Sequence, residues 1–478
     1  MGTYDADDWD DWRDEPPKRR RSCWFVGLAL LLVASLIASA VWSAVWLFRE
    51  TAVSPPPPTS APAPLPGRVA FIDREGQVMT IDPDGRNGRS LTDVPSAYQF
   101  PAWSPDGQRL AVINREAIYL LHDNAEPHEP IVLYRSTRQN PFYLYWSPDG
   151  RSLSFLANEP AGGIGLRLVQ TDRPYDEQLL ATGSPFYWQW LNDGRLLIHA
   201  GGSGAGARLA FLRLGEGSEA EESIAPPGQF QTPGISANGR FWAYAEGSGE
   251  TTSRLVVADS ETGEQWTLRH TGMVALSWSP VGSKLAFSNG LDERMATFWG
   301  PLRLLDAETG QATILSDDIV LGFFWSPNGR YLATIYTGDN NRSSGIIADQ
   351  SDPSAATPPA PLEPEVTAGL NRAKETGRPL PLARLNAQRP VAQFRVAVIN
   401  IETGEFRELA AFAPTRLFVG QFLPFFDQYA LSHRLWSPDS AAIVLPVIEN
   451  GVSRVKVFPI NGDPSIDLGR GDMPFWSP

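Results

Sequence analysis

Short runs of alternating apolar and polar residues follow one another along most of this chain, and turns rich in Pro, Asp and Gly separate them. One phrase returns many times: a tryptophan, then Ser-Pro-Asp-Gly or a close variant, then a second apolar run. The clearest copies begin at Trp103 (WSPDGQRLAV), Trp146 (WSPDGRSLSF), Trp278 (WSPVGSKLAF) and Trp325 (WSPNGRYLAT). Ser, Pro, Asp and Gly in this order suit the four positions of a type I turn. Each copy therefore predicts a β-hairpin, with the tryptophan at the end of its first strand.

Weaker copies of the phrase fill the intervals between the clear ones. They begin at Trp190, Ile235 and Trp436, and a truncated copy stands at Trp476. Successive copies are 43, 44, 45, 43, 47, 111 and 40 residues apart. A strand-turn-strand phrase at intervals of about 40 to 45 residues is typical of β-propeller blades. Because the tryptophan keeps its place in the phrase, we expect it to pack between successive blades.

The two ends of the repeat region predict how the ring closes. Gly67–Asp73, Gln77–Asp82 and Arg89–Thr92 resemble the second, third and fourth strands of a blade, and Asp472–Pro478 resembles a first strand with nothing after it. Pairing them would complete one blade and hide two sheet edges. We therefore predict an all-β fold: an eight-bladed β-propeller of four-stranded blades over residues 68–478. Seven blades is the alternative, if the weak copy at Ile235 belongs to a neighbouring blade.

The long step between the copies at Trp325 and Trp436 predicts one blade that carries an insertion. Only two strands are predicted after the Trp325 hairpin, at Phe394–Ile401 and Glu405–Leu409. Residues 337–393 lie between the hairpin and the first of these two strands. They are rich in proline and lack a sustained strand pattern, which favours a surface loop with a short helix around Glu363–Lys374. His433 is expected to lie in the strand that precedes Trp436.

The first part of the chain has a different character, because residues 23–48 contain no charged side chain. At about 1.5 Å per residue, a helix of this length crosses a hydrocarbon core of roughly 30 Å. The basic run Lys18–Arg21 stands directly before it, so the positive-inside rule predicts a cytoplasmic N-terminus and an extracytoplasmic propeller. A cleaved signal peptide is the alternative, since Ala38-Ser39-Ala40 suits a cleavage site. The hypothesis is a single-pass protein of the cell membrane.

Two polar segments flank this predicted transmembrane helix. Residues 49–67 include VSPPPPTSAPAPLP, which predicts an extended stalk that holds the propeller away from the bilayer. Residues 1–22 form a tail predicted to be disordered, in which residues 1–17 combine seven acidic side chains with Trp9 and Trp12. Such a segment is either a solvated tail or a ligand for a basic groove in a cytoplasmic partner.

Composition argues against several kinds of cross-link, partner and site in this chain. A single cysteine leaves no internal disulfide to stabilise the propeller, and a net charge of −14 argues against nucleic acid as a partner. Five histidines are present and none has the spacing of a metal-ligand pair. Asp82-Pro-Asp-Gly85 suits a turn better than a calcium loop, because the further acidic ligands are absent. We therefore assign no catalytic, cofactor-binding or metal-binding residue, and the sequence predicts a protein that is not an enzyme.

The repeats themselves resemble those of a known group. WSPDGRSLSF at Trp146 and IDPDGRNGRSLT at Ile81–Thr92 resemble the repeats of TolB-type propellers, within the broader WD-like and dipeptidyl-peptidase-IV-like propellers. The resemblance covers roughly residues 68–478. TolB proteins carry a small α/β domain before six blades, whereas dipeptidyl-peptidase-like enzymes carry their catalytic serine in a hydrolase domain after the propeller. Here the nearest string to a nucleophile elbow, Gly201–Ala205, lacks the closing glycine and is expected to be a turn.

These observations favour one functional hypothesis over two others. The favoured one is a membrane-anchored, extracytoplasmic propeller that binds an envelope protein or peptide as a scaffold, through its loops. One alternative is a transmembrane sensor that uses the acidic tail in the cytoplasm. The other is a propeller-type glycan hydrolase or lyase that acts at the mouth of the channel.

Overall fold

The computed structural model describes residues 64–93, 96–124, 129–215, 221–247, 253–291, 297–337 and 393–478, which all belong to one compact unit, Pro64–Pro478. The predicted tail, transmembrane helix and most of the stalk lie outside the described residues, as does nearly all of the insertion predicted at 337–393. Among the residues that are described, no helix is long and apolar enough to cross a membrane.

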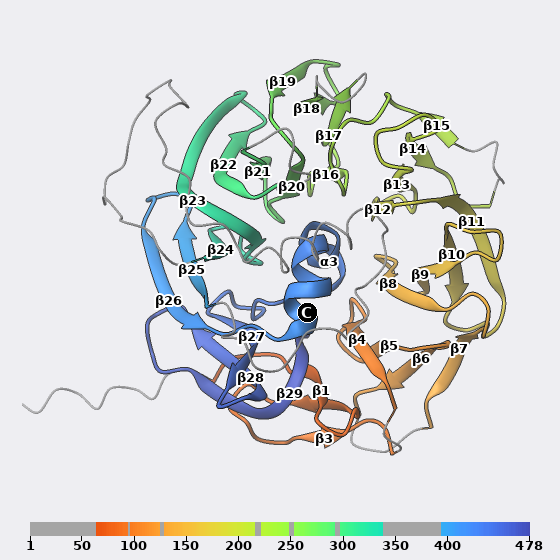
Figure 1. Ribbon diagram of the computed structural model, residues 1–478, viewed down its shortest axis with the longest axis vertical. Coiled ribbons are helices and arrows are strands. Elements are labelled where there is room, and N and C mark those ends of the chain that lie inside the picture. Colours follow the sequence, from red (N-terminus) through yellow and green to blue (C-terminus); the bar gives the residue numbers. More distant parts are fainter. Residues whose placement is uncertain are drawn as a thin grey trace, which may run out of the picture. The chain divides into compact units, whose positions relative to one another are not determined.

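Antiparallel strands dominate the described part of the chain and are arranged in sheets around a ring (Figure 1). The four-stranded sheets are β4–β7 (Tyr98–Trp103, Arg109–Asn114, Ala117–His122, Ile131–Arg135), β8–β11 (Pro141–Trp146, Ser152–Asn158, Ile164–Gln170, Glu177–Gly183), β12–β15 (Phe186–Trp190, Leu196–Ala200, Arg208–Leu212, Glu221–Ser223) and β16–β19 (Gly234–Ile235, Phe241–Gly247, Ser253–Asp259, Gln265–Arg269). A seven-stranded sheet holds β20–β26 (Val274–Trp278, Lys284–Asn289, Gly300–Asp306, Gln311–Trp325, Tyr331–Thr337, Phe394–Asn400, Phe406–Phe412). A six-stranded sheet joins β27–β29 (Ala442–Glu449, Val452–Pro459, Ile466–Trp476) to β1–β3 (Val69–Asp73, Val78–Ile81, Arg89–Ser90).

Two long strands account for the larger sheets. The first part of β23, Gln311–Ser316, pairs with β22, whereas its last part, Gly322–Trp325, pairs with β24. In the same way, β29 pairs with β28 through Ile466–Arg470 and with β1 through Gly471–Trp476. Each of these strands is therefore the outer strand of one group of strands and the inner strand of the next.

The ring closes through the two ends of the repeat region, as the sequence predicts. Val69 in β1 lies opposite Trp476 in β29, in an antiparallel register. The backbone N–H of Arg68 donates to the Ser477 hydroxyl over 3.0 Å, and the Ser477 N–H donates back to the Arg68 carbonyl over 2.8 Å. Strands from opposite ends of the chain thus share one sheet, and neither of the paired edges is left open.

Four of the repeated tryptophans connect neighbouring inner strands, in agreement with the packing role predicted for them. Their indole N–H groups donate to backbone carbonyls of the neighbouring inner strand: Trp103 to Phe475 (3.1 Å), Trp146 to Ala102 (3.0 Å), Trp325 to Ser277 (2.9 Å) and Trp436 to Phe324 (2.9 Å). In each pair the accepting residue directly precedes the tryptophan of the neighbouring copy. The side chains are buried or nearly so, and the bonds therefore satisfy both polar groups away from water.

The Ser-Pro-Asp-Gly phrases form the predicted turns. In the copy at Trp103, the Gly107 N–H donates to the Ser104 carbonyl over 2.9 Å, which is the first-to-fourth bond of a β-turn. The Asp106 carboxylate accepts a hydrogen bond from the Gln108 N–H over 3.1 Å. Gly107 has a φ of 69°, a left-handed conformation that glycine adopts without a steric penalty. Each turn is therefore stabilised by its own residues.

A helical segment, Phe418–Ser432, lies in the middle of the ring (Figure 1) and was not predicted from the sequence. It begins with a π-helix, η3 (Phe418–Phe422), continues as a 3₁₀-helix, η4 (Leu423–Phe425), and ends as α3 (Phe426–Ser432). The prediction that His433 lies in a strand is wrong, because this residue is the C-cap of α3. The chain therefore fills the centre of its own ring with the segment that joins β26 to β27, which we call the central helix.

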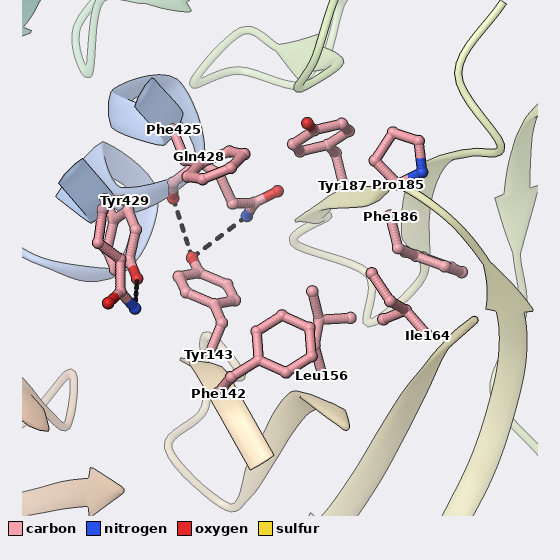
Figure 2. Close-up of a pocket in the computed structure, with 11 residues that line it drawn as sticks. Phe142, Tyr143, Leu156, Ile164, Pro185, Phe186, Tyr187, Phe425, Gln428 and Tyr429 are labelled. Carbon is pink, nitrogen blue, oxygen red and sulfur yellow. Dashed lines mark hydrogen bonds between the residues drawn. The ribbon is translucent and has the colours of Figure 1, made fainter. Parts of the chain in front are cut away.

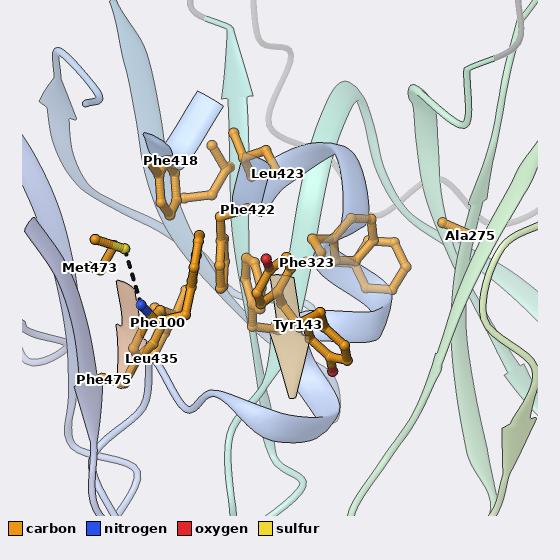
Figure 3. Packing of buried hydrophobic residues seen from close by; sticks show 14 of the residues in the cluster. Phe100, Tyr143, Ala275, Phe323, Phe418, Phe422, Leu423, Leu435, Met473 and Phe475 are labelled. Atoms are coloured by element: carbon orange, nitrogen blue, oxygen red, sulfur yellow. Dashed lines mark hydrogen bonds between the residues drawn. The ribbon is translucent and has the colours of Figure 1, made fainter. Parts of the chain in front are cut away.

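Aromatic side chains hold the central helix against the inner strands (Figure 3). The ring of Phe426 lies 5.2 Å from that of Phe298 and 4.8 Å from that of Phe323, in edge-to-face contacts. Phe422 stacks on Phe324 with ring centroids 5.7 Å apart. Fully burying one such ring is worth about 1.5 to 3 kcal/mol, and favourable ring geometry adds about 1 kcal/mol. The central helix is therefore part of the hydrophobic core.

Candidate functional site

A partly open pocket of about 40 Å³ lies between the central helix and two neighbouring sheets (Figure 2). Its lining is formed by Phe142, Tyr143, Leu156, Ile164, Pro185, Phe186, Tyr187, Gln421, Phe425, Gln428 and Tyr429. None of these side chains carries a charge. The pocket is therefore an apolar site with a few fixed polar groups, the usual composition of a ligand-binding cavity.

The strand side of the pocket is formed where inner strands begin. Phe142 and Tyr143 lie at the start of β8, and Phe186 and Tyr187 lie at the start of β12. Both strands are the innermost of their sheets (Figure 1), and their beginnings therefore lie toward the same face of the ring. Leu156 in β9 and Ile164 at the start of β10 complete this side.

The helix side is fixed by one glutamine side chain. The amide of Gln428 donates to the Trp188 carbonyl over 2.8 Å and accepts from the Trp188 N–H over 2.8 Å. This pair of bonds joins α3 to β12 in the way that a neighbouring strand would. All of these groups are buried, so the loss of the side chain would leave two backbone groups without partners.

The Tyr143 hydroxyl joins the strand side to the helix side (Figure 2). It donates to the Gln428 carbonyl over 2.9 Å and lies 2.7 Å from the Ser432 hydroxyl. The amide of Gln428 also donates to this hydroxyl over 3.3 Å. Burial raises the pKa of Tyr143 well above its ordinary value, and the phenol therefore stays neutral.

The remaining polar side chains of the lining also have partners. The Gln421 amide donates to the Tyr429 hydroxyl over 3.1 Å, and the Gln231 amide donates to the Tyr187 hydroxyl over 3.2 Å. Burial raises the pKa of both tyrosines. The pocket thus presents mainly carbon surface, and these polar side chains are hydrogen-bonded within the protein.

Behind the pocket, His433 continues this chain of hydrogen bonds. Its Nδ1 lies 2.6 Å from the Ser432 hydroxyl, and its Nε2 lies 3.3 Å from the Phe100 carbonyl. Burial lowers the pKa of His433 to about 3, so the imidazole is neutral at physiological pH. It packs edge-to-face on Phe475 with ring centroids 4.5 Å apart. A neutral, enclosed ring of this kind orients the Ser432 hydroxyl and supports the wall that contains Tyr143.

A buried carboxyl group lies near the start of the central helix. One oxygen of Asp472 accepts hydrogen bonds from the Thr415 hydroxyl and from the Met473 N–H, both over 2.8 Å. Apolar residues, among them Phe100 and Phe418, line a cavity of about 10 Å³ beside it. Burial raises the pKa of Asp472 to about 6, and the two hydrogen bonds oppose that rise. This carboxyl group connects the segment before the central helix to the closing strand β29.

The sequence motifs considered earlier have structural roles. Asp82 forms an ion pair with Arg68, and the Gly85 N–H donates to the Asp82 carbonyl over 2.9 Å, as expected of a turn. His199 stacks on Phe230 with ring centroids 4.2 Å apart and forms a hydrogen bond with the Gly202 carbonyl, within the Gly201–Ala205 segment. No group of three His, Cys, Asp or Glu residues within the described ranges could hold a metal ion.

None of the pocket residues was predicted from the sequence. Their only common sequence signal is an aromatic side chain at the beginning of an inner strand, as at Phe142 and Phe186. The helix side carries a periodic signal, because Phe418, Phe422 and Tyr429 recur at intervals of about one or two helical turns. That signal predicts a helix but does not place it within the ring.

Comparison with known proteins supports the resemblance in the repeats. No protein-family model matches the chain. It is 28% identical over 134 residues to the Tol-Pal system protein TolB of Anaeromyxobacter sp. (strain K), a match that covers 25% of this chain and 30% of that protein. It is 38% identical over 61 residues to TolB of Nitrosomonas europaea, which covers 12% of this chain and 14% of that protein. The chain thus spans less than a third of the length of these curated relatives.

Among solved structures, TolB from Acinetobacter baumannii is similar over 88% of this chain and 69% of its own, with 14% sequence identity and a TM-score of 0.39. The sequence matches to TolB agree with the repeated phrase and with the antiparallel sheets. In its repeats this chain is therefore similar to the β-propellers of TolB proteins.

Proposed function

We propose that this protein is an extracytoplasmic scaffold that binds an envelope protein or peptide through an eight-bladed propeller. The strand pairing supports this blade number, because four sheets would each be one blade and the two larger sheets would each divide into two at a shared long strand. The blade that contains β27 and β28 has its first strand reduced to a bridge between Trp436 and Ile443.

The observation that carries the proposal is the apolar pocket beside the central helix. It lies where two inner strands begin, so a partner that contacts the loops on this face can reach it. The pocket has hydrogen-bonded walls, which limits the conformational entropy that binding would cost. The two TolB relatives, each described as a Tol-Pal system protein, support a protein partner in the envelope.

The central helix favours binding over catalysis at the channel. The glycan hydrolase or lyase alternative places its substrate at the channel mouth, where the ring is filled by aromatic side chains such as Phe426. The residues that line the pocket are apolar or neutral, whereas glycoside hydrolysis uses paired carboxyl groups.

Membrane attachment belongs to the same proposal. Residues 23–48 would span the membrane with residues 1–22 in the cytoplasm, and residues 49–67 would hold the propeller away from the bilayer. The sensor alternative uses the same arrangement, but it requires residues 1–17 for partner recruitment. Deletion of these residues separates the two hypotheses.

In-cell cross-linking of the full-length protein, followed by mass spectrometry, tests the proposal. We expect one partner to be captured both by the full-length chain and by a chain that lacks residues 1–17, with cross-links at propeller loops. Capture that depends on residues 1–17 would favour the sensor hypothesis. Capture no greater than that of residues 1–67 expressed alone would refute a macromolecular partner for the propeller.

A further inference from the structure

We propose that His199 is a pH-dependent clamp on the glycine-rich loop of residues 201–206, which joins β13 to β14 beside the pocket. The protonated imidazole holds this loop, and the neutral imidazole releases it. The inference deepens the proposed function, because it concerns regulation of the same pocket, and it rests on that function only for the effect on a partner.

Both ring nitrogens of His199 face backbone carbonyl oxygens. Its Nδ1 lies 2.7 Å from the Gln231 carbonyl, and its Nε2 lies 2.9 Å from the Gly202 carbonyl. A carbonyl oxygen only accepts hydrogen bonds, and a neutral imidazole has a single N–H to donate. Turning the ring over would place carbon atoms beside these oxygens, well inside the roughly 3.3 to 3.6 Å of a C–H···O contact. Only the protonated ring therefore satisfies both contacts.

The packing around the ring stabilises its charged form. The imidazole is completely buried and lies parallel to Phe230, with ring centroids 4.2 Å apart. A cation within about 6 Å of the centroid of an aromatic ring is attracted to its face. Burial lowers the pKa of His199 below its ordinary value of 6.5, and the hydrogen bonds to the two carbonyls oppose that shift. We therefore expect the clamp to close below pH 6.5 and to open above it.

Titratable side chains on the elements around His199 have partners of their own. Tyr187 on β12 is neutral, because burial raises its pKa. Arg208 on β14 forms an ion pair with Glu221 on β15, and Asp427 on α3 accepts hydrogen bonds from two backbone N–H groups. The segment of residues 224–233 and the glycine-rich loop contain no titratable side chain. The protonation of His199 itself therefore controls its contacts with the two carbonyls.

The glycine-rich loop is the partner that yields when the ring is neutral. Gln231 is fully buried, whereas residues 203–206 are exposed. A Cβ atom at Gly204 or Gly206 would meet no other atom within 4 Å, so this part of the loop has free space around it. The contact with Gly202 is therefore the one that opens.

Hydrogen bonds connect the clamp to residues that line the pocket (Figure 2). The Gly201 N–H donates to the Pro185 carbonyl over 2.9 Å, and the Gln231 amide donates to the Tyr187 hydroxyl over 3.2 Å. Pro185 and Tyr187 both belong to the lining of the pocket. Release of the loop therefore removes support from the rim at Pro185, and partner binding should weaken as the pH rises.

Hydrogen–deuterium exchange of the purified full-length protein, read by mass spectrometry at pH 4 and pH 8, tests the inference. Peptides that cover residues 200–207 report on the loop, in which the Gly201 and Ala207 N–H groups are hydrogen-bonded. After correction for the intrinsic pH dependence of exchange, we expect the loop to be at least about fivefold better protected at pH 4. The loop of residues 159–163, between β9 and β10, contains no histidine and is the internal control.

Paired substitutions assign the response to His199. His199→Gln removes the titrating group, and the corrected protection of the loop should then be the same at both pH values. His270→Gln is the matched control, because Nδ1 of His270 contacts a single carbonyl, that of Gly272, over 3.1 Å, which a neutral ring can satisfy.

A second variant serves if thermal melting shows that His199→Gln is unfolded. Phe230→Leu keeps the histidine but removes the aromatic face that stabilises the cation. It should move the midpoint of the loop response to lower pH by about half a unit.

The outcomes separate this inference from the proposed function. A response that is lost in His199→Gln and kept in His270→Gln supports the clamp, even if cross-linking captures no partner, a result that would refute the proposed function alone. Equal protection at both pH values, or a response that His199→Gln leaves unchanged, overturns the clamp, even if a partner is captured. An unchanged midpoint in Phe230→Leu also overturns it. Partner capture that is equally strong at pH 5 and pH 8 would overturn the connection between the clamp and the pocket.

Discussion

Replacing Asp472 by asparagine should stabilise the protein at neutral pH. The carboxyl group is largely buried, and burial raises its pKa to about 6 from the ordinary value of 3.8. At pH 7.5 the folded protein therefore contains an ionised group in an apolar environment. Asparagine keeps an oxygen that can accept from the Thr415 hydroxyl and the Met473 N–H, but it carries no charge. The substitution thus removes the charge and preserves the two hydrogen bonds.

The size and sign of the effect follow from the pKa of Asp472. A difference of about two pKa units corresponds to about 3 kcal/mol, which the ionised form costs the folded state above pH 6. As the pH falls from 6 to 4, the folded state takes up a proton that the unfolded state has not yet bound, so the contribution of Asp472 to stability rises. The advantage of Asp472→Asn should therefore be about 2 to 3 kcal/mol at pH 7.5 and about 1 kcal/mol smaller at pH 5.

Calorimetric melting of the full-length protein and the variant at pH 7.5 and pH 5 measures both quantities. For a domain of this size, about 1 kcal/mol shifts the melting temperature by roughly 1 °C. Asp463→Asn is the matched control, because this aspartate is exposed, and its effect should be small at both pH values. An Asp472→Asn variant that is less stable than the natural protein at pH 7.5, or equally stabilised at both pH values, would refute the reasoning.

Three further predictions concern the ring and the central helix. Trp146→Phe leaves the Ala102 carbonyl without its indole donor and should destabilise the fold by about 2 to 3 kcal/mol, measured by denaturant unfolding; an unchanged midpoint would contradict the packing role. Gln428→Leu removes both hydrogen bonds to Trp188 and should lower the free energy of unfolding by about 2 to 4 kcal/mol. It should also speed amide hydrogen exchange in α3. Unchanged exchange would show that these bonds do not hold the helix in place. The buried imidazole of His433 has a pKa of about 3, so between pH 6.5 and pH 3 it stays neutral in the folded protein while the unfolded chain binds a proton, which lowers stability. His433→Asn should therefore lose less stability than the natural protein over this pH range. A melting temperature with the same pH dependence as that of the natural protein would contradict this prediction.

The hairpins and the ring closure could be predicted because their information is local or repeated. Ser104 and Gly107 form a turn from bonds within four residues, and other copies of the phrase repeat that bond, as at Ser147–Gly150 and Ser326–Gly329. The closing strand could be recognised because Trp476 begins another copy of the phrase. In these cases the residues that contact one another are either close in sequence or marked by the repeated phrase, so the sequence was enough to predict the contacts.

The central helix and the pocket depend on contacts between distant parts of the chain. Gln428 and Trp188 are 240 residues apart, and nothing in the sequence around either residue indicates that they meet. The aromatic spacing in Phe418–Ser432 suits a helix, but its position follows from the space that the closed ring leaves at its centre. The pocket then forms only after the helix and the inner strands are both in place.

The pairing of β1 with β29 has a consequence for biogenesis. A chain that emerges residue by residue can form its hairpins early, but β1 has no partner on one edge until Trp476 and its neighbours have been made. During that interval an unpaired strand is open to association with other chains, and contacts that span nearly the whole repeat region form slowly. Loss of a few residues from the C-terminal strand should therefore harm the yield of folded protein far more than its share of the core suggests. A chaperone that shields β1 during synthesis or export would act at the step where the chain is most exposed to aggregation.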